Sequence, residues 1–267
     1  MHGYSDHCNR YYELFPRLAA RGIAVVGFDQ RGWGRSAATA AERGDAGPTA
    51  RVLADVAAVV QAQADGGEPL FVMGHSMGGA IALALASTPA YAELARVVRG
   101  WLMESPYIAL PAAAAPPALK VAAGRLAAWV APRVQLAHRI PPASLTRDPA
   151  VAASLAADKL CFNVGTLETL AAMMERADAL ACGRYRLNDG VRALWIAHGT
   201  ADLATDFRSS ELYCAAQTTV ADRTFKPYTD WSHQLHADLP ETRPVFARDV
   251  GDWILARCGS IEGEAKL

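Results

Sequence analysis

Short apolar runs alternate with amphipathic stretches along much of the chain. The apolar runs cover residues 23–28, 70–73 and 97–103, and helical patterns cover residues 9–20, 49–64 and 77–87. Both patterns return late in the chain, with apolar runs at 191–197 and 223–228 and helices at 207–216 and 246–257. A short run that is apolar on both faces is typical of a parallel strand buried between helical layers. The alternation therefore predicts an α/β fold with a mostly parallel sheet flanked by helices.

The alternation is interrupted between residues 105 and 186. This segment begins with a Pro- and Ala-rich run and continues with helical patterns, and none of it has a clear strand pattern. Leu119, Leu126 and Val130 fall on one helical face, with Trp129 beside them. Because the segment is too long for a simple loop, we interpret residues 105–186 as a helical cap inserted into a single α/β domain of residues 1–267. Packing as one more helical layer and movement as a lid both remain open.

Composition and charge restrict the class of protein. Hydrophobic residues make up 52% and charged residues 20% of the 267 positions, which suits a packed core. Lys and Arg number 26 against 27 Asp and Glu, so no excess of positive charge is available to bind nucleic acid. The five cysteines form no CxxC pair, and we expect neither a zinc site nor a disulfide framework. The first residues lack an apolar run of signal-peptide length, which predicts a cytoplasmic protein.

The first chemical motif is Gly74-His75-Ser76-Met77-Gly78, which matches G-x-S-x-G. An apolar strand runs into it and a small-residue helix leaves it, as in the strand–turn–helix that exposes a serine nucleophile. The positive end of that helix faces the negative charge that develops during attack. The motif in this context predicts Ser76 as the nucleophile.

A serine hydroxyl needs a base, and two histidines follow the last predicted strand. Because the chain order in this arrangement is serine, acid, histidine, we predict His233, the first of the two, and keep His236 as the alternative. His75 lies inside the turn, and we expect its side chain to point away from the reacting face of Ser76. His198 ends a strand and is expected to be structural.

The acid is expected in a loop at the carboxyl end of a strand, between the serine and the histidine. Asp202 follows the strand at 191–197 and is our prediction, since it would fix the imidazole tautomer and stabilise the imidazolium. Asp206 is a rival whose structural role would be to cap the helix at 207–216. Glu104, at the end of an earlier strand, is a further alternative.

These motifs resemble those of the α/β-hydrolase superfamily, and most of all the fungal monoacylglycerol lipases among its serine hydrolases. The similar stretches are HGYSDHCNRYYELFPRLAARG, FDQRGWGRS, GHSMGG, GTLETLAAMMERADAL, HGTADLATDF, WSHQLHADLPE and DVGDWILAR. The resemblance implies a triad of Ser76, Asp202 and His233. It also implies an oxyanion hole formed by the backbone N–H groups of Tyr4 and Met77.

The resemblance implies a serine ester hydrolase that acts on monoacylglycerols or similar lipid esters and needs no cofactor or metal. The cap would line the acyl-chain site, and its peripheral contact with a membrane or lipid droplet is one interpretation of its apolar face. Lysophospholipase, general esterase and aminopeptidase activities on the same scaffold remain alternatives, as does a non-catalytic hydrolase-like protein.

The resemblance also implies a strand directly before His2, between the strands at 23–28 and 70–73. The printed sequence begins at Met1. We therefore expect an N-terminally truncated domain in which two apolar strands lack the strand that would separate them.

Overall fold

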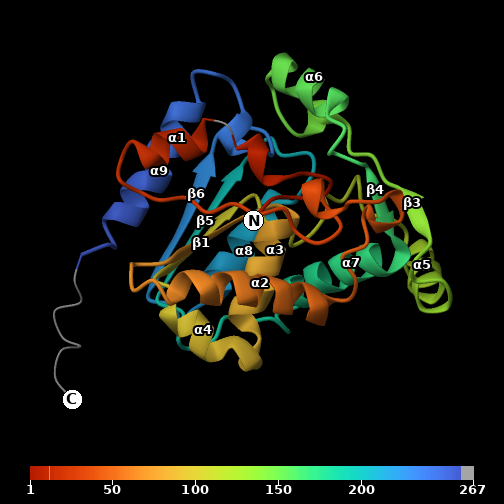
Figure 1. Cartoon of the computed structure of the whole chain (residues 1–267), viewed down its shortest axis with the longest axis horizontal. Coiled ribbons are helices and arrows are strands. Elements are labelled where there is room, and N and C mark those ends of the chain that lie inside the picture. Colours follow the sequence, from red (N-terminus) through yellow and green to blue (C-terminus); the bar gives the residue numbers. More distant parts are fainter. Residues whose placement is uncertain (12, 260–267) are drawn as a thin grey trace.

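The computed structural model describes residues 1–11 and 13–259, and a parallel sheet lies at its centre (Figure 1). Its four strands, in spatial order, are β1 (Phe71–His75), β2 (Gly100–Glu104), β5 (Ala193–Gly199) and β6 (Asp222–Tyr228). All neighbouring strands are parallel, which confirms the predicted fold class. Because parallel strands end at the same edge, the residues that follow these four strands come together there.

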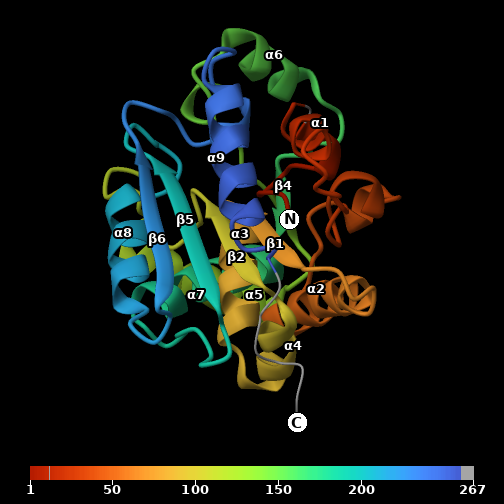
Figure 2. The ribbon, with the colours of Figure 1, turned by 90° about the vertical axis from the view of Figure 1, so that its left-hand side faces the viewer.

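Helices cover both faces of the sheet (Figure 2). One layer holds α1 (Leu14–Ala19) and α9 (Arg243–Leu255), and the other holds α2 (Thr49–Ala64), α3 (Met77–Ser87), α4 (Ala92–Val97), α7 (Leu167–Ala181) and α8 (Phe207–Ala216). Short 3-10 turns lie at Cys8–Arg10, Gly34–Ser36, Ala40–Glu42, Pro89–Tyr91, Pro142–Ser144 and Leu235–Ala237. Strand β2 serves both layers, because Trp101 and Met103 pack with α3 while Leu102 packs with α9.

The cap segment, residues 105–186, leaves the sheet after β2. It contains α5 (Ala118–Val130), β3 (Gln135–Ala137), α6 (Pro149–Ala157), β4 (Val164–Thr166) and α7. Strands β3 and β4 form an antiparallel pair, so the expectation of a cap without strands was wrong. Each has three residues, too few to show a period-two pattern. Helix α7 packs on α3 in the core, whereas α5 lies at the far side of α7 from the sheet (Figure 1).

The predicted strand at residues 23–28 is not a strand. The segment is extended but joins no ladder among the described residues, and Val26 is 60% exposed. A two-sided apolar run becomes a buried strand only where a neighbouring strand accepts its backbone hydrogen bonds. On the edge of β1 away from β2, His75 N–H donates to Met1 O (3.0 Å).

Several further boundaries differ from the sequence prediction. The predicted helix at 246–257, for example, begins three residues earlier, as α9. The helix expected at 9–20 is confined to α1, preceded by the 3-10 turn at Cys8–Arg10. The strand expected from residue 97 begins at Gly100, because Ala92–Val97 forms α4. In the described part of the chain no helix is both long enough and apolar enough to cross a bilayer.

Candidate active site

Ser76 occupies a strained turn between β1 and α3. Its backbone has φ 53° and ψ −118°, a conformation that side-chain-bearing residues adopt rarely. The turn is held on both sides: Ser76 N–H donates to Glu104 O (3.0 Å), and Ser76 O accepts from Tyr107 N–H (3.0 Å) and Ala80 N–H (3.1 Å). The backbone therefore fixes the direction in which the Ser76 side chain leaves the turn before any ligand binds.

The turn is tight enough to require glycine on either side. A Cβ at Gly74 would lie 2.5 Å from Gly78 O, and a Cβ at Gly78 would lie 2.5 Å from His2 O. The loop at His2 and Gly3 thus packs directly against the start of α3. His2 is fixed by Gln30. The backbone N–H of Gln30 donates to His2 Nε2 (2.9 Å), and its side-chain amide donates to His2 O (2.8 Å).

Asp202 and His233, 31 residues apart in the chain, meet at the carboxyl edge of the sheet. His233 Nδ1 lies 2.7 Å from Asp202 Oδ2, and both side chains are buried. Because a carboxylate only accepts, the imidazole carries its proton on Nδ1 and keeps Nε2 as an acceptor. Asp202 follows β5 and His233 follows β6, so the strand ends position both residues.

Sequence reasoning missed two further partners of the Asp202 carboxylate. His198 Nε2 lies 2.9 Å from Asp202 Oδ2, and the Thr205 hydroxyl donates to the same oxygen (2.9 Å). Asp202 Oδ1 accepts from the N–H groups of Ala204 (2.7 Å) and Thr205 (2.9 Å). His198 was expected to be structural, and it contacts the acid instead of simply filling the core. The signal was its position near the end of β5, four residues before Asp202 in the loop that follows.

These contacts keep Asp202 ionised. Burial opposes the charge, but His233 and His198 outweigh burial and hold the pKa of Asp202 well below its usual range. An ionised acid that is already saturated with donors can orient His233 and stabilise its charged form.

The two rival acids have other contacts. Asp206 caps α8, since its carboxylate accepts from Ser209 N–H (2.7 Å). Glu104 is fully buried and lies 2.7 Å from Nδ1 of His236, the alternative base. His236 also stacks on Tyr11, with ring centroids 4.3 Å apart. Glu104 and His236, the alternatives that the sequence left open for the acid and the base, thus form a second carboxylate–imidazole pair.

His75 links the two pairs. Its ring centroid lies 4.6 Å from that of His233, and its Nδ1 lies 3.8 Å from Glu104 Oε2. Contrary to the sequence expectation, His75 lines the same cavity as Ser76. Burial lowers the pKa of His75 well below its usual value, against the attraction of Glu104, so the ring is neutral.

Two backbone N–H groups beside Ser76 are free to bind an anion. Among residues 1–11 and 13–259, no protein acceptor pairs with the N–H of Tyr4 or of Met77. Met77 begins α3, where the helix dipole favours negative charge. The side chain of Tyr4 is fixed by its hydroxyl, which donates to His138 O (3.1 Å), and by its edge contact with Trp33.

A cavity of about 110 Å³ opens above Ser76 and His233. Its polar lining residues include Ser5, Asp6, Arg139, Asn163 and Gln234. Its apolar lining residues include Ile140, Pro142, Leu145, Leu155 and Ala156, all from the cap. The cavity therefore suits a ligand with both polar and apolar parts.

Two groups of side chains in the described residues are close enough to share a metal ion. His75, Glu104 and His236 form one, buried beneath the cavity, and His7, Asp158 and Cys161 form the other. In the first group Glu104 Oε1 already accepts from His236 N–H (3.0 Å) and contacts its ring. Neither group includes Ser76, Asp202 or His233.

Comparisons with known proteins agree over most of the chain. A family model described as serine aminopeptidase, S33, matches residues 1–240. A provisionally named monoglyceride lipase of Schizosaccharomyces pombe is 30% identical over 258 residues, 95% of this chain and 66% of that protein. The monoglyceride lipase of Mus musculus is 31% identical over 268 residues, 96% of this chain and 81% of the mouse protein.

A solved structure has a similar arrangement. A soluble variant of monoglyceride lipase from Saccharomyces cerevisiae, in complex with a substrate analog, matches with a TM-score of 0.86 and 23% identity. The match covers 97% of this chain and 86% of that one. At this identity the likeness concerns the fold. The chain also spans slightly less than two-thirds of the Schizosaccharomyces pombe protein.

Replacing Glu104 with Gln should alter stability in a pH-dependent way. Burial opposes the charge of Glu104, but the ring and the backbone N–H of His236 outweigh burial and lower the pKa of Glu104 from 4.5 to about 2. A lowered folded-state pKa stabilises the fold above the unfolded pKa, and that contribution disappears as pH falls to about 2. We expect Glu104→Gln to cost roughly 3 kcal/mol at pH 7 and progressively less below pH ~4.5.

Urea unfolding at several pH values measures this difference. Glu93→Gln is the matched control, since its side chain is 87% exposed, and it should have a small effect at every pH. A Glu104→Gln deficit that stays constant between pH 7 and pH 3 would contradict the buried-charge interpretation.

Proposed function

The chain belongs to the serine aminopeptidase S33 family and has the α/β-hydrolase fold, and on this premise we propose that it is a serine ester hydrolase acting on monoacylglycerols. One observation supports this most strongly. Asp202 lies 2.7 Å from His233, and His233 lines one cavity with Ser76 on its strained turn. The monoglyceride lipase names of the relatives support the choice of substrate.

In the first half-reaction the Ser76 hydroxyl oxygen attacks the ester carbonyl carbon. His233 Nε2 takes the hydroxyl proton, and Asp202 stabilises the resulting imidazolium through Nδ1–H. The N–H groups of Tyr4 and Met77 hold the carbonyl oxygen as it becomes negative. The tetrahedral intermediate then collapses, the ester C–O bond breaks, and His233 gives its proton to the departing alcohol.

The second half-reaction releases the acid. Water loses a proton to His233 Nε2 and attacks the acyl carbon bound to Ser76. The oxyanion donors act again, the bond to the serine oxygen breaks, and the proton returns to Ser76. The enzyme is regenerated with a fatty acid as product.

The lining of the cavity suits both parts of a monoacylglycerol. Its apolar side chains suit the first carbons of an acyl chain, and its polar side chains offer partners to glycerol hydroxyls. A cavity of about 110 Å³ is far below the roughly 300–1,000 Å³ of pockets that enclose larger ligands. A long acyl chain therefore requires the cap to move outward.

We place the lipid surface against α5. This helix has no buried residue, and its exposed apolar side chains are Leu119, Leu126, Trp129 and Val130. Lys120 and Arg133 lie exposed nearby, where they can meet anionic headgroups, while Arg125 is paired with Asp178. Contact of α5 with a membrane or lipid droplet would deliver the substrate to the cap.

Ser76→Ala should abolish ester hydrolysis and covalent labelling by a fluorophosphonate, since it removes the attacking oxygen. We expect a loss on the order of 10⁶-fold in kcat. The alternative activities are distinguished by measuring which substrates the unmodified protein hydrolyses. The substrates compared are monoacylglycerols of different chain length, lysophospholipids and aminoacyl arylamides. Preferred cleavage of arylamides would favour an aminopeptidase, and retained labelling of Ser76→Ala would refute the nucleophile.

Asp202→Asn should lower kcat by about 10³–10⁴-fold, because the amide favours the wrong tautomer of His233. Asp206→Asn is the matched control four residues away, and its effect should be small, because Asn caps a helix about as well as Asp. Steady-state kinetics on a soluble ester compares the two. If Asp206→Asn caused the larger loss, the assignment of the acid would be wrong.

Trp129→Ser should impair turnover of a dispersed long-chain monoacylglycerol and spare a short soluble ester. Trp129 is 82% exposed, so its replacement removes apolar surface from α5 without opening a cavity in the core. Leu212→Ser, on a helix outside the cap and also exposed, serves as the control. Equal losses on both substrates would point to a role in folding.

A further inference from the structure

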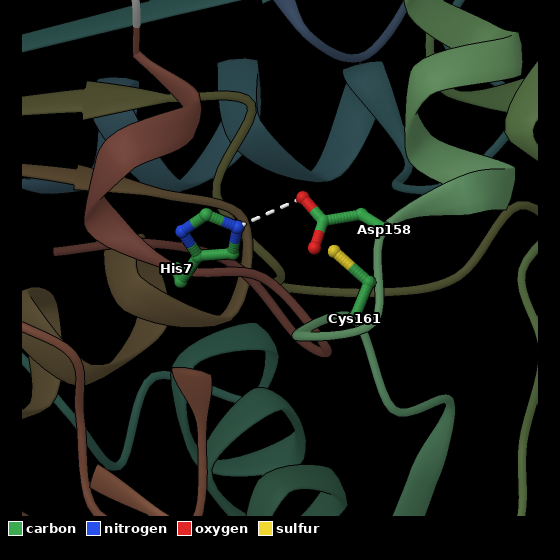
Figure 3. A group of neighbouring side chains, drawn as sticks. All are labelled: His7, Asp158 and Cys161. Atoms are coloured by element: carbon green, nitrogen blue, oxygen red, sulfur yellow. Dashed lines mark hydrogen bonds and ion pairs between the residues drawn. The ribbon is translucent and has the colours of Figure 1, made fainter. Parts of the chain in front are cut away.

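His7, Asp158 and Cys161 come together where the cap meets the loop that carries Tyr4 (Figure 3). His7 lies three residues after Tyr4, and Asp158 ends α6 of the cap. Asp158 also shapes the turn to Cys161: its Oδ1 accepts from Leu160 N–H (2.9 Å) and its carbonyl accepts from Cys161 N–H (3.2 Å). This turn places the thiol next to the carboxylate, as Figure 3 shows.

The three side chains offer a nitrogen, an oxygen and a sulfur atom, all within 4.8 Å of one another. Imidazole, carboxylate and thiolate are the ligands of zinc in proteins. His7 Nε2 lies 2.9 Å from Asp158 Oδ2. A tetrahedral ion with bonds of about 2.0–2.1 Å would separate these atoms by roughly 3.4 Å, so a shift of about half an ångström would admit it.

One ligand atom of the group has no hydrogen-bond partner in the described part of the chain. The thiol of Cys161 is close to the imidazole and the carboxylate and makes no hydrogen bond there. Burial raises the pKa of Cys161 to about 12, so the metal would have to displace the thiol proton.

The charges around the group also suit a divalent cation. Arg10 Nη1 lies 2.9 Å from Asp158 Oδ2, and Arg10 Nε lies 3.7 Å from Asp6 Oδ1. Two carboxylates and one guanidinium leave one negative charge. A metal-bound thiolate adds a second, which matches the two positive charges of the ion.

We propose that His7 Nε2, the Asp158 carboxylate and Cys161 Sγ form a binding site for Zn²⁺. Cys161 and Asp6 line the cavity above Ser76, so water from the cavity can take the fourth position. The bound ion joins the cap to the loop of Tyr4. On the basis of the proposed function, the ion and its water occupy the cavity wall at Cys161 and Asp6 and so inhibit turnover of long-chain substrate.

Binding is tested with Co²⁺ as a spectroscopic substitute for Zn²⁺ on the full chain. We expect a thiolate-to-cobalt charge-transfer absorption that saturates at one equivalent and disappears on addition of Zn²⁺. Cys161→Ser should abolish it, and His7→Gln should weaken Co²⁺ binding by at least tenfold. Cys8→Ser is the matched control, because this neighbour of His7 is a free cysteine outside the group, and it should keep the absorption.

The absorption does not depend on turnover, so its failure is distinguishable from failure of the proposed hydrolase function. If no such absorption appears at saturating Co²⁺, the three side chains are only an ion-pair network and the proposed metal site is refuted. An absorption retained in Cys161→Ser, with circular dichroism showing both proteins folded, would overturn it as well. The hydrolysis rate of a long-chain ester is measured with and without Zn²⁺, and each protein is compared with its own metal-free rate. Zn²⁺ should inhibit the unmodified chain more than Cys161→Ser. Equal inhibition of the two proteins would refute inhibition through this site.

Discussion

The turn at Ser76 is the constraint on which the site depends. A non-glycine residue at φ 53° and ψ −118° costs about 1–3 kcal/mol, and the surrounding structure must hold it there. Here the backbone of β2 and the segment after it supply that support, through Glu104 O and Tyr107 N–H. The same strand end carries the side chain of Glu104, so the support for the turn and the charges beneath it come from one element.

Two buried carboxylates lie beneath the cavity, each with its own imidazole. Asp202 takes His233 and His198, and Glu104 takes His236, while the neutral ring of His75 lies between the pairs. Both histidines contact a carboxylate through Nδ1, so that contact does not distinguish them. His233 lines the cavity with Ser76, whereas His236 is not among its lining residues. The position of the cavity, and not the carboxylate contact, favours His233 as the proposed base.

Local patterns predicted the local features well. Helices Thr49–Ala64, Met77–Ser87 and Phe207–Ala216 begin and end where the sequence placed them, and the motif around Ser76 forms the expected turn. Features that depend on partners were not predictable. No sequence pattern predicts the strand register that places Glu104 opposite both His75 and Ala197. The contact between His7 and Asp158, 151 residues apart in the chain, could not be predicted either. The prediction of a strand at residues 23–28 was wrong for the same reason, since an apolar run does not reveal whether a neighbouring strand pairs with it.

The cap is attached unevenly, and this decides how it can open. Around α6, Asp158 pairs with Arg10 and Asp148 pairs with Arg243, and Arg147 pairs with the fully buried Asp238. Separating a buried carboxylate from its partner leaves an uncompensated charge and costs several kcal/mol.

Helix α5 is held differently: its apolar side chains already face solvent, and its ion pair with α7 is exposed. A movement of α5 therefore breaks fewer buried ion pairs than a movement of α6, provided that β3, which follows α5, stays paired with β4. A metal at the junction of α6 with the loop of Tyr4 would strengthen the side of the cap that is already fixed, and so increase this asymmetry.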